Sequence, residues 1–218
     1  MSLNVVMYGP PGAGKGTQAS RLAGERRIPR ISTGNILREA VHANTEFGRR
    51  AKSTLDAGDL VRDDVMVGIV HERVARPDAA DGFVLDGFPR TVVQATALDD
   101  ILSGREPLAV IELAVPDDEL VGRLSRRRVC AVCDAIFGVD DAEIPATCPP
   151  CGGPLSQRSD DREDVVRERL RVYYQRTSPV LAFYKGRPRF RSVNGNLTPD
   201  VVAAAIRVAI DETNGVHP

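Results

Sequence analysis

Short apolar runs alternate with longer stretches of helical period along this chain. The runs are Leu3–Met7, Ile28–Ile31, Phe83–Leu85, Ala109–Leu113 and Phe190–Val193. The clearest helical stretch is Glu163–Tyr184, where apolar side chains recur near one face, and another follows Thr198 and Pro199 from Asp200 to Asp211. This alternation predicts βαβ units, a parallel sheet, and ligands beyond the carboxyl ends of its strands.

Two segments interrupt the alternation. Residues 32–61 are mostly helical in pattern and contain no strand run. Residues 129–159 are rich in cysteine, proline and glycine and lack helical period. We interpret both as insertions that project from the core, since 218 residues suffice for one core and one or two small subdomains.

The composition argues against several classes of protein. The formal net charge is −1 and Trp is absent, so neither charge nor aromatic content favours binding to nucleic acid or anionic lipid. No apolar run approaches the roughly 20 residues that a membrane span requires. The first residues contain no basic leader, so we expect a cytoplasmic protein. In that reducing compartment we expect the four cysteines to be metal ligands or free thiols rather than disulfides.

A glycine-rich loop follows the first predicted strand. It reads GPPGAGKGT over residues 9–17, and its glycines allow successive backbone N–H groups to face an anion at the start of a helix. Lys15 supplies a mobile positive charge for the outer phosphates of a nucleotide. The usual loop has a hydroxyl residue directly after the lysine, whereas here Gly16 precedes Thr17. A plain turn is the alternative, but the flanking strand and helix favour a phosphate loop.

Polar residues also gather after the second and third strand runs. Asp86-Gly-Phe-Pro-Arg90 follows the third run, which places an arginine fork at the carboxyl edge of the sheet, where it can bind a phosphate with two hydrogen bonds. Ser32-Thr-Gly-Asn35 follows the second run and opens a predicted helix. Its side chains suit an N-cap, and a helix cap without any role in binding is the plainer interpretation of this cluster.

Four cysteines form two C-x-x-C pairs in the second interrupting segment. Cys130 and Cys133 are separated from Cys148 and Cys151 by fourteen residues, a pattern typical of a tetrahedral Zn²⁺ site with four thiolates. Four sulfurs leave no open position, so the metal would be structural and would supply folding free energy. A segment without metal, or one linked by disulfides, is the alternative.

Arginines flank the cysteine segment on both sides. The predicted helix Asp117–Arg127 contains Arg123 and Arg127 four residues apart, and hence on one face. Arg158 follows the segment, and Arg169 lies in the next predicted helix. Phosphoryl transfer spreads negative charge over several oxygens, so it needs clustered cations. For any single arginine, a solvated helix face is the alternative.

Together these motifs resemble the adenylate kinase family over essentially the whole chain and in the expected order. The resemblance implies that ATP is bound by Gly12, Ala13, Gly14, Lys15, Gly16, Thr17, Arg123 and Arg127. It implies that AMP is bound by Thr33, Arg38, Asp59, Leu60, Val61, Gly87, Phe88, Pro89, Arg90, Gln94, Arg158 and Arg169. The implied catalytic cations are Lys15, Arg90, Arg123, Arg127, Arg158 and Arg169. Asp86 would order Mg²⁺ through water, and Gln94 would read the edge of the adenine.

The resemblance also implies an architecture and a reaction. We expect an α/β, P-loop NTPase-type core with a five-stranded parallel sheet, formed by residues 1–31, 62–123 and 161–218. Residues 32–61 would be the AMP-binding insertion, and residues 124–160 a lid closed around zinc by the four cysteines. The expected reaction is reversible Mg²⁺-dependent transfer, ATP + AMP = 2 ADP, in a cytoplasmic monomer that binds neither nucleic acid nor membrane.

One position departs from the family's pattern. Asn35 stands where the family usually has Asp. Asparagine caps a helix about as well as aspartate does, so folding should survive the change. What it puts in question is any charge role of this side chain toward Arg38.

Three other functions compete with this interpretation. A kinase for another nucleoside monophosphate is the nearest, although Thr33 and Thr91 favour AMP by resemblance. A nucleotide-dependent switch would explain the glycine loop but would not need a second nucleotide site. A zinc-ribbon nucleic-acid binder needs an excess of positive charge, whereas acids outnumber arginines by one over residues 119–160.

Overall fold

A five-stranded parallel sheet runs through the centre of the molecule. The structure, a computed structural model, describes residues 3–105, 108–138 and 144–213. The strands are β1 (Leu3–Tyr8), β2 (Arg30–Ser32), β3 (Gly82–Asp86), β4 (Leu108–Ala114) and β8 (Phe190–Asn194). They lie in the order β2-β3-β1-β4-β8, and each neighbouring pair is parallel. The predicted α/β fold with a five-stranded parallel sheet is therefore confirmed.

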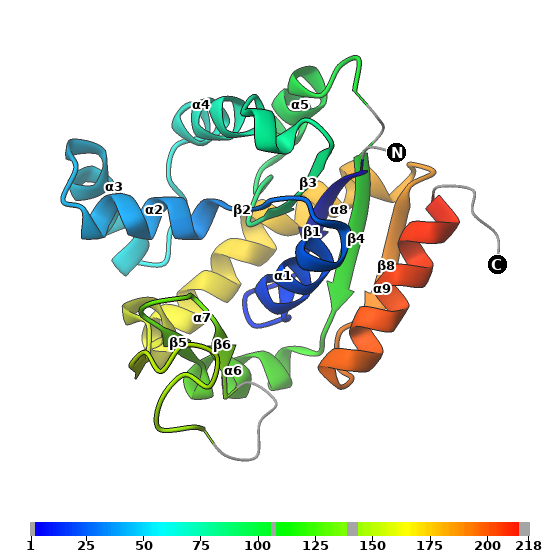
Figure 1. The fold of residues 1–218 in the computed structure, drawn as a ribbon. Helices are drawn as coiled ribbons and strands as arrows, with labels where there is room; N and C mark the ends of the chain where they lie inside the picture. Colours follow the sequence, from blue (N-terminus) through cyan, green and yellow to red (C-terminus); the bar gives the residue numbers. More distant parts are fainter. Residues whose placement is uncertain (1–2, 106–107, 139–143, 214–218) are drawn as a thin grey trace.

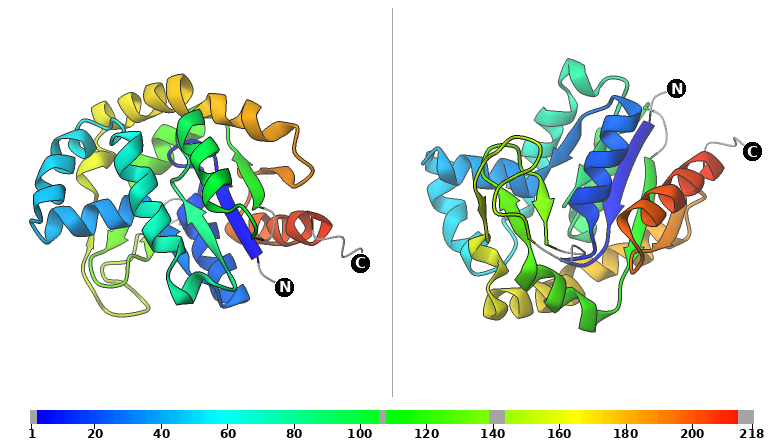
Figure 2. Two further views of the ribbon diagram at one scale, coloured as in Figure 1. Left: turned by 90° about the horizontal axis from the view of Figure 1, so that it is seen from above. Right: turned by 60° about the horizontal axis from the view of Figure 1, so that its bottom comes forward.

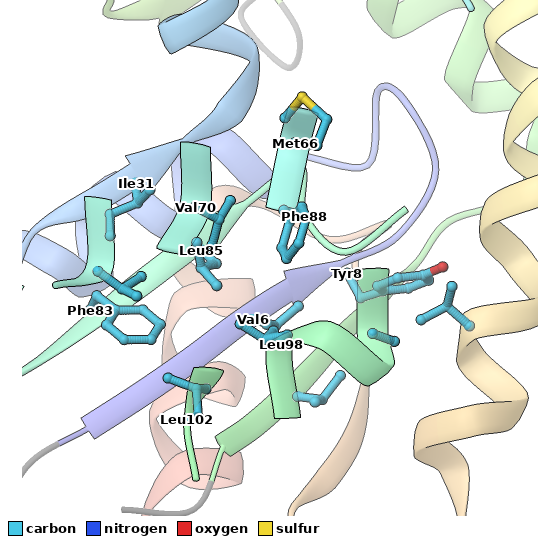
Figure 3. Packing of buried hydrophobic residues seen from close by; sticks show 14 of the residues in the cluster. Val6, Tyr8, Ile31, Met66, Val70, Phe83, Leu85, Phe88, Leu98 and Leu102 are labelled. Atoms are coloured by element: carbon cyan, nitrogen blue, oxygen red, sulfur yellow. The ribbon is translucent and has the colours of Figure 1, made fainter. Parts of the chain in front are cut away.

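Both faces of the sheet are buried, because successive side chains of a strand point to opposite sides. In β1, Val6 and Tyr8 join one apolar cluster, whereas Val5 and Met7 join the other. Figure 3 shows the first cluster, which includes Ile31, Met66, Val70, Phe83, Leu85, Phe88, Leu98 and Leu102. A strand covered on both faces reads as a continuous apolar run, which is why the pattern predicted these strands.

Helices cover the two faces of the sheet (Figures 1 and 2). The helices α1 (Lys15–Arg26) and α9 (Pro199–Thr213) pack on one face. On the other face lie α4 (Asp63–Val74), α5 (Val92–Ile101) and α8 (Ser178–Lys185), with a short 3₁₀ turn, η1 (Pro77–Ala79), before β3. Among the helices that the structure describes, none is both long and apolar enough to cross a membrane.

The second strand begins two residues later than its apolar run predicted. Arg27, the residue after α1, has a left-handed backbone with φ of 55°. Pro29 has no N–H to donate to a ladder, although its carbonyl accepts a bond from the backbone N of Val84 at 2.9 Å. Regular pairing with β3 therefore starts at Arg30.

The predicted helix Glu163–Tyr184 consists of two helices joined by a wider turn. α7 (Glu163–Val172) leads into a π-helical turn, η3 (Tyr173–Thr177), before α8 begins. Pro179 follows the turn and cannot donate the regular i to i−4 hydrogen bond, so a local widening of the helix is accommodated there. The turn places Tyr173 and Thr177 in the wall of a cleft.

Two segments lie outside the central layers (Figure 1). The first contains α2 (Thr33–His42) and α3 (Glu46–Asp56), which pack on each other. The second follows α6 (Asp117–Arg126) and forms a small antiparallel sheet in the order β6-β5-β7. Its elements are β5 (Arg128–Cys130), β6 (Ile136–Phe137), β7 (Leu155–Ser156) and the 3₁₀ turn η2 (Ser159–Asp161).

The small sheet was not predicted, because strands of two or three residues are too short to show a period. Residues 139–143 of the predicted lid lie outside the described residues. The same holds for residues 1–2, 106–107 and 214–218 of the predicted core.

Candidate active site

The glycine loop joins the carboxyl end of β1 to the start of α1. Gly12 and Gly14 have φ of 88° and 89°, a region that glycine adopts without the steric penalty of a side chain. The Nζ of Lys15 donates to the carbonyls of Gly9 and Pro10, each at 2.8 Å. The side chain of Lys15 thus folds back onto the glycine loop.

Lys15 lies among other cations. Burial lowers the pKa of Lys15 to about 7, and Asp86 opposes this shift. The positive charges of Arg90, Arg169 and Arg127 lower the same pKa further. An amine held this close to neutrality by its neighbours favours the approach of an anion, which would restore its charge.

Gly16 occupies a place where a side chain would be crowded. A Cβ at this position would lie 3.0 Å from Nη2 of Arg30 and 3.2 Å from Cδ1 of Ile136 in β6, both closer than ordinary contact. A serine or threonine directly after Lys15 would therefore require the ends of these two side chains to shift by a few tenths of an ångström.

Asp86 at the end of β3 pairs with Arg30 at the start of β2. The distance between Oδ2 and Nη2 is 2.7 Å. Burial alone would raise the pKa of Asp86, but the charges of Arg30 and Lys15 outweigh it and hold that pKa below its usual value. The carboxylate therefore stays ionised at the carboxyl edge of the sheet. The sequence analysis missed Arg30, because an arginine that opens a short strand belongs to no motif.

The turn after β3 is held from behind by two residues predicted to bind AMP. Thr33 donates its hydroxyl to the carbonyl of Gly87 at 2.9 Å. The Oε1 of Gln94 accepts from the backbone N of Arg90 at 2.7 Å, and its Nε2 donates to Asp63 at 2.8 Å. Both side chains are almost fully buried. In this arrangement they therefore position Arg90 rather than face the cleft.

Three arginines in the cleft have a lowered pKa. Burial lowers the pKa of Arg38, Arg90 and Arg158, and that of Arg158 falls to about 9. Arg38 and Arg127 add to the shift of Arg158. The buried Nε of Arg158 has no hydrogen-bond partner within the described part of the chain. Since buried donors are normally satisfied, this nitrogen is a candidate donor to a ligand.

Two further arginines share one buried acid. Arg127 donates Nε to Oδ2 of Asp161 at 2.7 Å and Nη2 to its Oδ1. Arg169 donates to the same Oδ1 at 3.1 Å, and also pairs with Asp160 at 3.1 Å. The side chain of Asp161 is fully buried. One carboxylate thus fixes two cations that come from opposite ends of the predicted lid.

The expectation that Arg123 and Arg127 share a helical face was wrong. α6 ends at Arg126, and Arg127 has an extended backbone with φ of −57° and ψ of 132°. The acid Asp161 draws the guanidinium of Arg127 away from the helix, whereas Arg123 donates to the carbonyl of Gly195 at 3.0 Å. Both arginines nevertheless line the cleft.

Most of the predicted site residues line this single cleft. They are Gly12, Gly14, Lys15, Gly16, Thr17, Arg38, Asp59, Leu60, Asp86, Gly87, Phe88, Pro89, Arg90, Arg123, Arg127, Arg158 and Arg169. Ala13, Thr33, Val61 and Gln94 lie behind this lining, and Val61 packs against the apolar core. The sequence analysis did not assign Tyr8, Arg30, Ile136, Asp160 or Tyr173, which also line the cleft, because no motif distinguishes them.

The four cysteine sulfurs converge in the small antiparallel sheet and lie within 4.8 Å of one another. The Sγ atom of Cys133 lies 3.5 Å from that of Cys148 and 3.4 Å from that of Cys151. These distances are too long for a disulfide and approach the roughly 3.8 Å between sulfurs of a tetrahedral zinc site with Zn–S of about 2.3 Å. Burial raises the pKa of Cys130, but backbone N–H groups of Cys133 and Val132 outweigh it and lower that pKa to about 6. A thiolate is the form that binds metal.

Comparison with known proteins places the chain among named relatives. A model of the adenylate kinase family matches residues 7–188. A protein named adenylate kinase from Geotalea daltonii is 51% identical over 197 residues, which cover 88% of this chain and 92% of that protein. One of the same name from Archaeoglobus fulgidus is 48% identical, with 88% and 91% covered. Another from Geobacter sulfurreducens is 46% identical over 217 residues, 98% of this chain and all of that protein.

The buried acid Asp161 yields a prediction about stability. In Asp161→Asn, two arginines lose a buried carboxylate, and we expect the free energy of unfolding to fall by about 3–5 kcal/mol. Urea denaturation measures this loss. The matched control is Asp164→Asn, whose ion pair with Arg162 is exposed and should contribute less than about 1 kcal/mol. Equal losses for the two variants would contradict the role given to Asp161.

Proposed function

The chain belongs to the adenylate kinase family, and from this membership we propose how its cleft transfers a phosphoryl group between ATP and AMP. The reaction is ATP + AMP = 2 ADP. One observation carries the proposal, namely that cations from several elements converge on one cleft beside the glycine loop: Lys15, Arg38, Arg90, Arg123, Arg127, Arg158 and Arg169. Phosphate groups relieve the mutual repulsion of these cations, which is why the cleft suits a reaction between two nucleotides.

The glycine loop holds the phosphates of ATP. Its N–H groups and the positive end of α1 face the phosphates, along the stretch from Gly12 to Thr17. Lys15 leaves the carbonyls of Gly9 and Pro10 and turns to the outer phosphates. Arg123 and Arg127 complete the charge around ATP from the side of α6.

AMP binds on the side formed by α2 and the end of β3. Arg38 and Arg90 hold its phosphate, and the bidentate guanidinium geometry fixes the direction of that phosphate. Asp59 and Leu60, which line the cleft, close over the base, and Val61 supports them from the apolar core. Gln94 reads the adenine edge once its amide exchanges the bond to Asp63 for one to the ligand, and Thr33 supports the turn from Gly87 to Pro89.

The transfer itself depends on position and charge. Arg90, Arg158 and Arg169, together with Lys15, neutralise the oxygens of the moving phosphoryl group, so no general base is required. Ile136 of the lid lies against Gly16, and the covering lid excludes water that would otherwise hydrolyse ATP.

Two oxygen donors in the cleft fit Mg²⁺, which prefers hard oxygen ligands. Asp86 is kept ionised by its cationic neighbours, and Thr17 also lines the cleft. Asp86 would hold the metal through water, and Thr17 would contact it directly. Held there, Mg²⁺ would neutralise part of the negative charge on the phosphates of ATP.

The four cysteines fit structural Zn²⁺. Their sulfurs lie within 4.8 Å of one another, close to the spacing of a tetrahedral site. Cys130, Cys133, Cys148 and Cys151 would hold the ion, which would stabilise a sheet whose strands have only two or three residues.

The chain divides into three parts in this proposal. Residues 32–61 are the AMP-binding insertion, residues 124–160 are the lid, and residues 1–31, 62–123 and 161–218 are the core. The enzyme works as a cytoplasmic monomer on ATP, AMP and ADP, without nucleic acid or membrane. The support for a monomer is that one chain supplies both the ATP side and the AMP side of the cleft.

The direct test of the proposed function is ADP formation from MgATP with AMP, CMP, UMP, GMP or water as acceptor. We expect rapid turnover with AMP and little with the others. Arg90→Lys should lower kcat/KM for AMP about a hundredfold, because an ammonium cannot replace a bidentate fork. Arg207→Lys is the matched control, since Arg207 pairs with Glu25 at the surface. Preference for another monophosphate would contradict the assignment of AMP as the acceptor. Absence of turnover with every acceptor would contradict the proposed reaction.

The lowered pKa of Lys15 yields a prediction about pH. With a pKa of about 7, Lys15 is mostly neutral at pH 8 and becomes charged when phosphates approach. Binding of MgATP should therefore take up about one proton at pH 8 and almost none at pH 6. Calorimetry in buffers of different ionisation enthalpy measures this uptake. Lys15→Arg, which keeps its charge, should bind without it. Absence of uptake by the wild type at pH 8 would contradict the shift.

The zinc proposal predicts one Zn²⁺ per chain by metal analysis. Chelation should lower the melting temperature by about 5 °C or more, because a ligand that binds only the folded lid stabilises it. Cys148→Ser should melt at the lower temperature already, and chelation should not change it further. Unchanged melting of the wild type after loss of the metal would show that the ion is not structural.

A further inference from the structure

The side chain of Asn35 connects the AMP-binding insertion to the lid. Asn35 lies in the first turn of α2, and its Oδ1 accepts a hydrogen bond from Nη2 of Arg38 at 2.5 Å. Its Nδ2 donates to Oδ2 of Asp134 at 3.0 Å. Asp134 follows Cys133 in the turn between β5 and β6. One amide thus joins an arginine of the cleft wall to an acid of the predicted lid.

This bridge requires a head group that both donates and accepts hydrogen bonds. A guanidinium only donates hydrogen bonds and a carboxylate only accepts them, whereas the asparagine amide does both. Aspartate at position 35 would keep the bond to Arg38 but would face Asp134 as a like charge. The chain of donors and acceptors from Arg38 through Asn35 to Asp134 is therefore incompatible with aspartate at position 35.

The local needs of α2 do not explain the asparagine. The N-cap is Ser32, whose hydroxyl accepts from the backbone N of Asn35, so the amide group takes no part in the cap. The first turn of α2 contains no acid, although the helix dipole would favour a negative charge there. Helix stability alone would thus favour aspartate, and the contact with the lid is what distinguishes asparagine.

Both ends of the bridge are held in place by their surroundings. The backbone N of Asp134 donates to the carbonyl of Cys130 at 3.1 Å, which ties the acid to the first cysteine pair. At the other end, the guanidinium of Arg38 lies over Gly34, where a Cβ would be 3.2 Å from both terminal nitrogens. A second contact between the same two segments, from Ser159 to Asp56, is longer at 3.4 Å.

We propose that Asn35 is a positioning residue that latches the lid onto the AMP-binding insertion and fixes Arg38 for the phosphate of AMP. The role of Arg38 in this inference rests on the proposed function. When the lid closes, the Asp134 carboxylate orients the amide, and the amide orients the guanidinium. Closure of the lid and formation of the AMP site are then coupled through one side chain.

The test uses a charge exchange across the contact. Asn35→Asp breaks the latch, whereas Asn35→Asp with Asp134→Asn restores it in the opposite sense, since the new carboxylate accepts from both Arg38 and the new amide. The matched control is Asn44→Asp, the same substitution in the turn between α2 and α3. Within the described residues the side chain of Asn44 makes no hydrogen bond to the lid, and its backbone carbonyl accepts from Arg49.

The first readout is lid closure without any nucleotide, so it is independent of the proposed reaction. Fluorophores are attached through unnatural amino acids at the exposed positions Arg50 and Ala146, which leaves the cysteines untouched. We expect the ratio of closed to open molecules to fall about two- to fivefold in Asn35→Asp. It should recover in the double variant and stay unchanged in Asn44→Asp. Equal ratios in Asn35→Asp and Asn44→Asp, or no recovery in the double variant, would overturn the latch.

The second readout separates positioning from a general loss of structure. KM for AMP should rise about two- to fivefold in Asn35→Asp, while kcat is unchanged or higher because the lid opens more readily. The double variant should recover the wild-type KM, and a fall of kcat with KM unchanged would contradict the inference. Metal analysis verifies that each variant keeps its zinc. If the variant with Asp134→Asn loses zinc, Asn35→Ala replaces it as the second test and must show the same loss of closure as Asn35→Asp. If AMP proves not to be the acceptor, the measurement of closure still decides the latch.

Discussion

Positive charges are confined together in one partly buried cleft, and much of the structure follows from that confinement. Lys15, Arg90 and Arg158 each have a lowered pKa because burial and neighbouring cations both disfavour their charge. Three acids, Asp86, Asp160 and Asp161, lie between the cations and offset part of the repulsion. The acids offset enough of this repulsion for the cleft to fold, but the cleft retains excess positive charge. Phosphate groups neutralise that remaining charge, which water cannot do.

The parallel sheet is what allows this confinement. In a parallel sheet the strands end at the same edge, so the glycine loop after β1, Asp86 at the end of β3 and the start of α2 after β2 are brought together without long excursions of the chain. The remaining cations come from α6, from α7 and from the segment between them: Arg123, Arg127, Arg158 and Arg169. The sheet supplies the phosphate loop, and the segment between α6 and α7 supplies a cover that contains charge of its own.

The sequence revealed those parts of the site that local chemistry specifies. A glycine loop between a strand and a helix, four cysteines at metal spacing, and a strand that ends in Asp86 each have a pattern that a short stretch of chain displays. Asp161 has none, because its importance arises from two arginines thirty-four and eight positions away. The same holds for Arg30, which matters only because Asp86 of another strand lies beside it. The roles of these residues depend on contacts between different segments of the chain. The hydrophobic periodicity of the sequence contains no information on such contacts.

The cations of the cleft also have acceptors within the protein. Lys15 donates to two carbonyls, and Arg127 donates to Asp161. Both side chains line the cleft while they make these bonds, so binding of a ligand would replace one acceptor by another and order little new structure. Because reorganisation is small, the binding energy of phosphates remains for stabilising the transition state. Asn35 differs from these groups in that its acceptor, Asp134, belongs to the proposed lid, so its bond depends on how that segment is placed over the cleft.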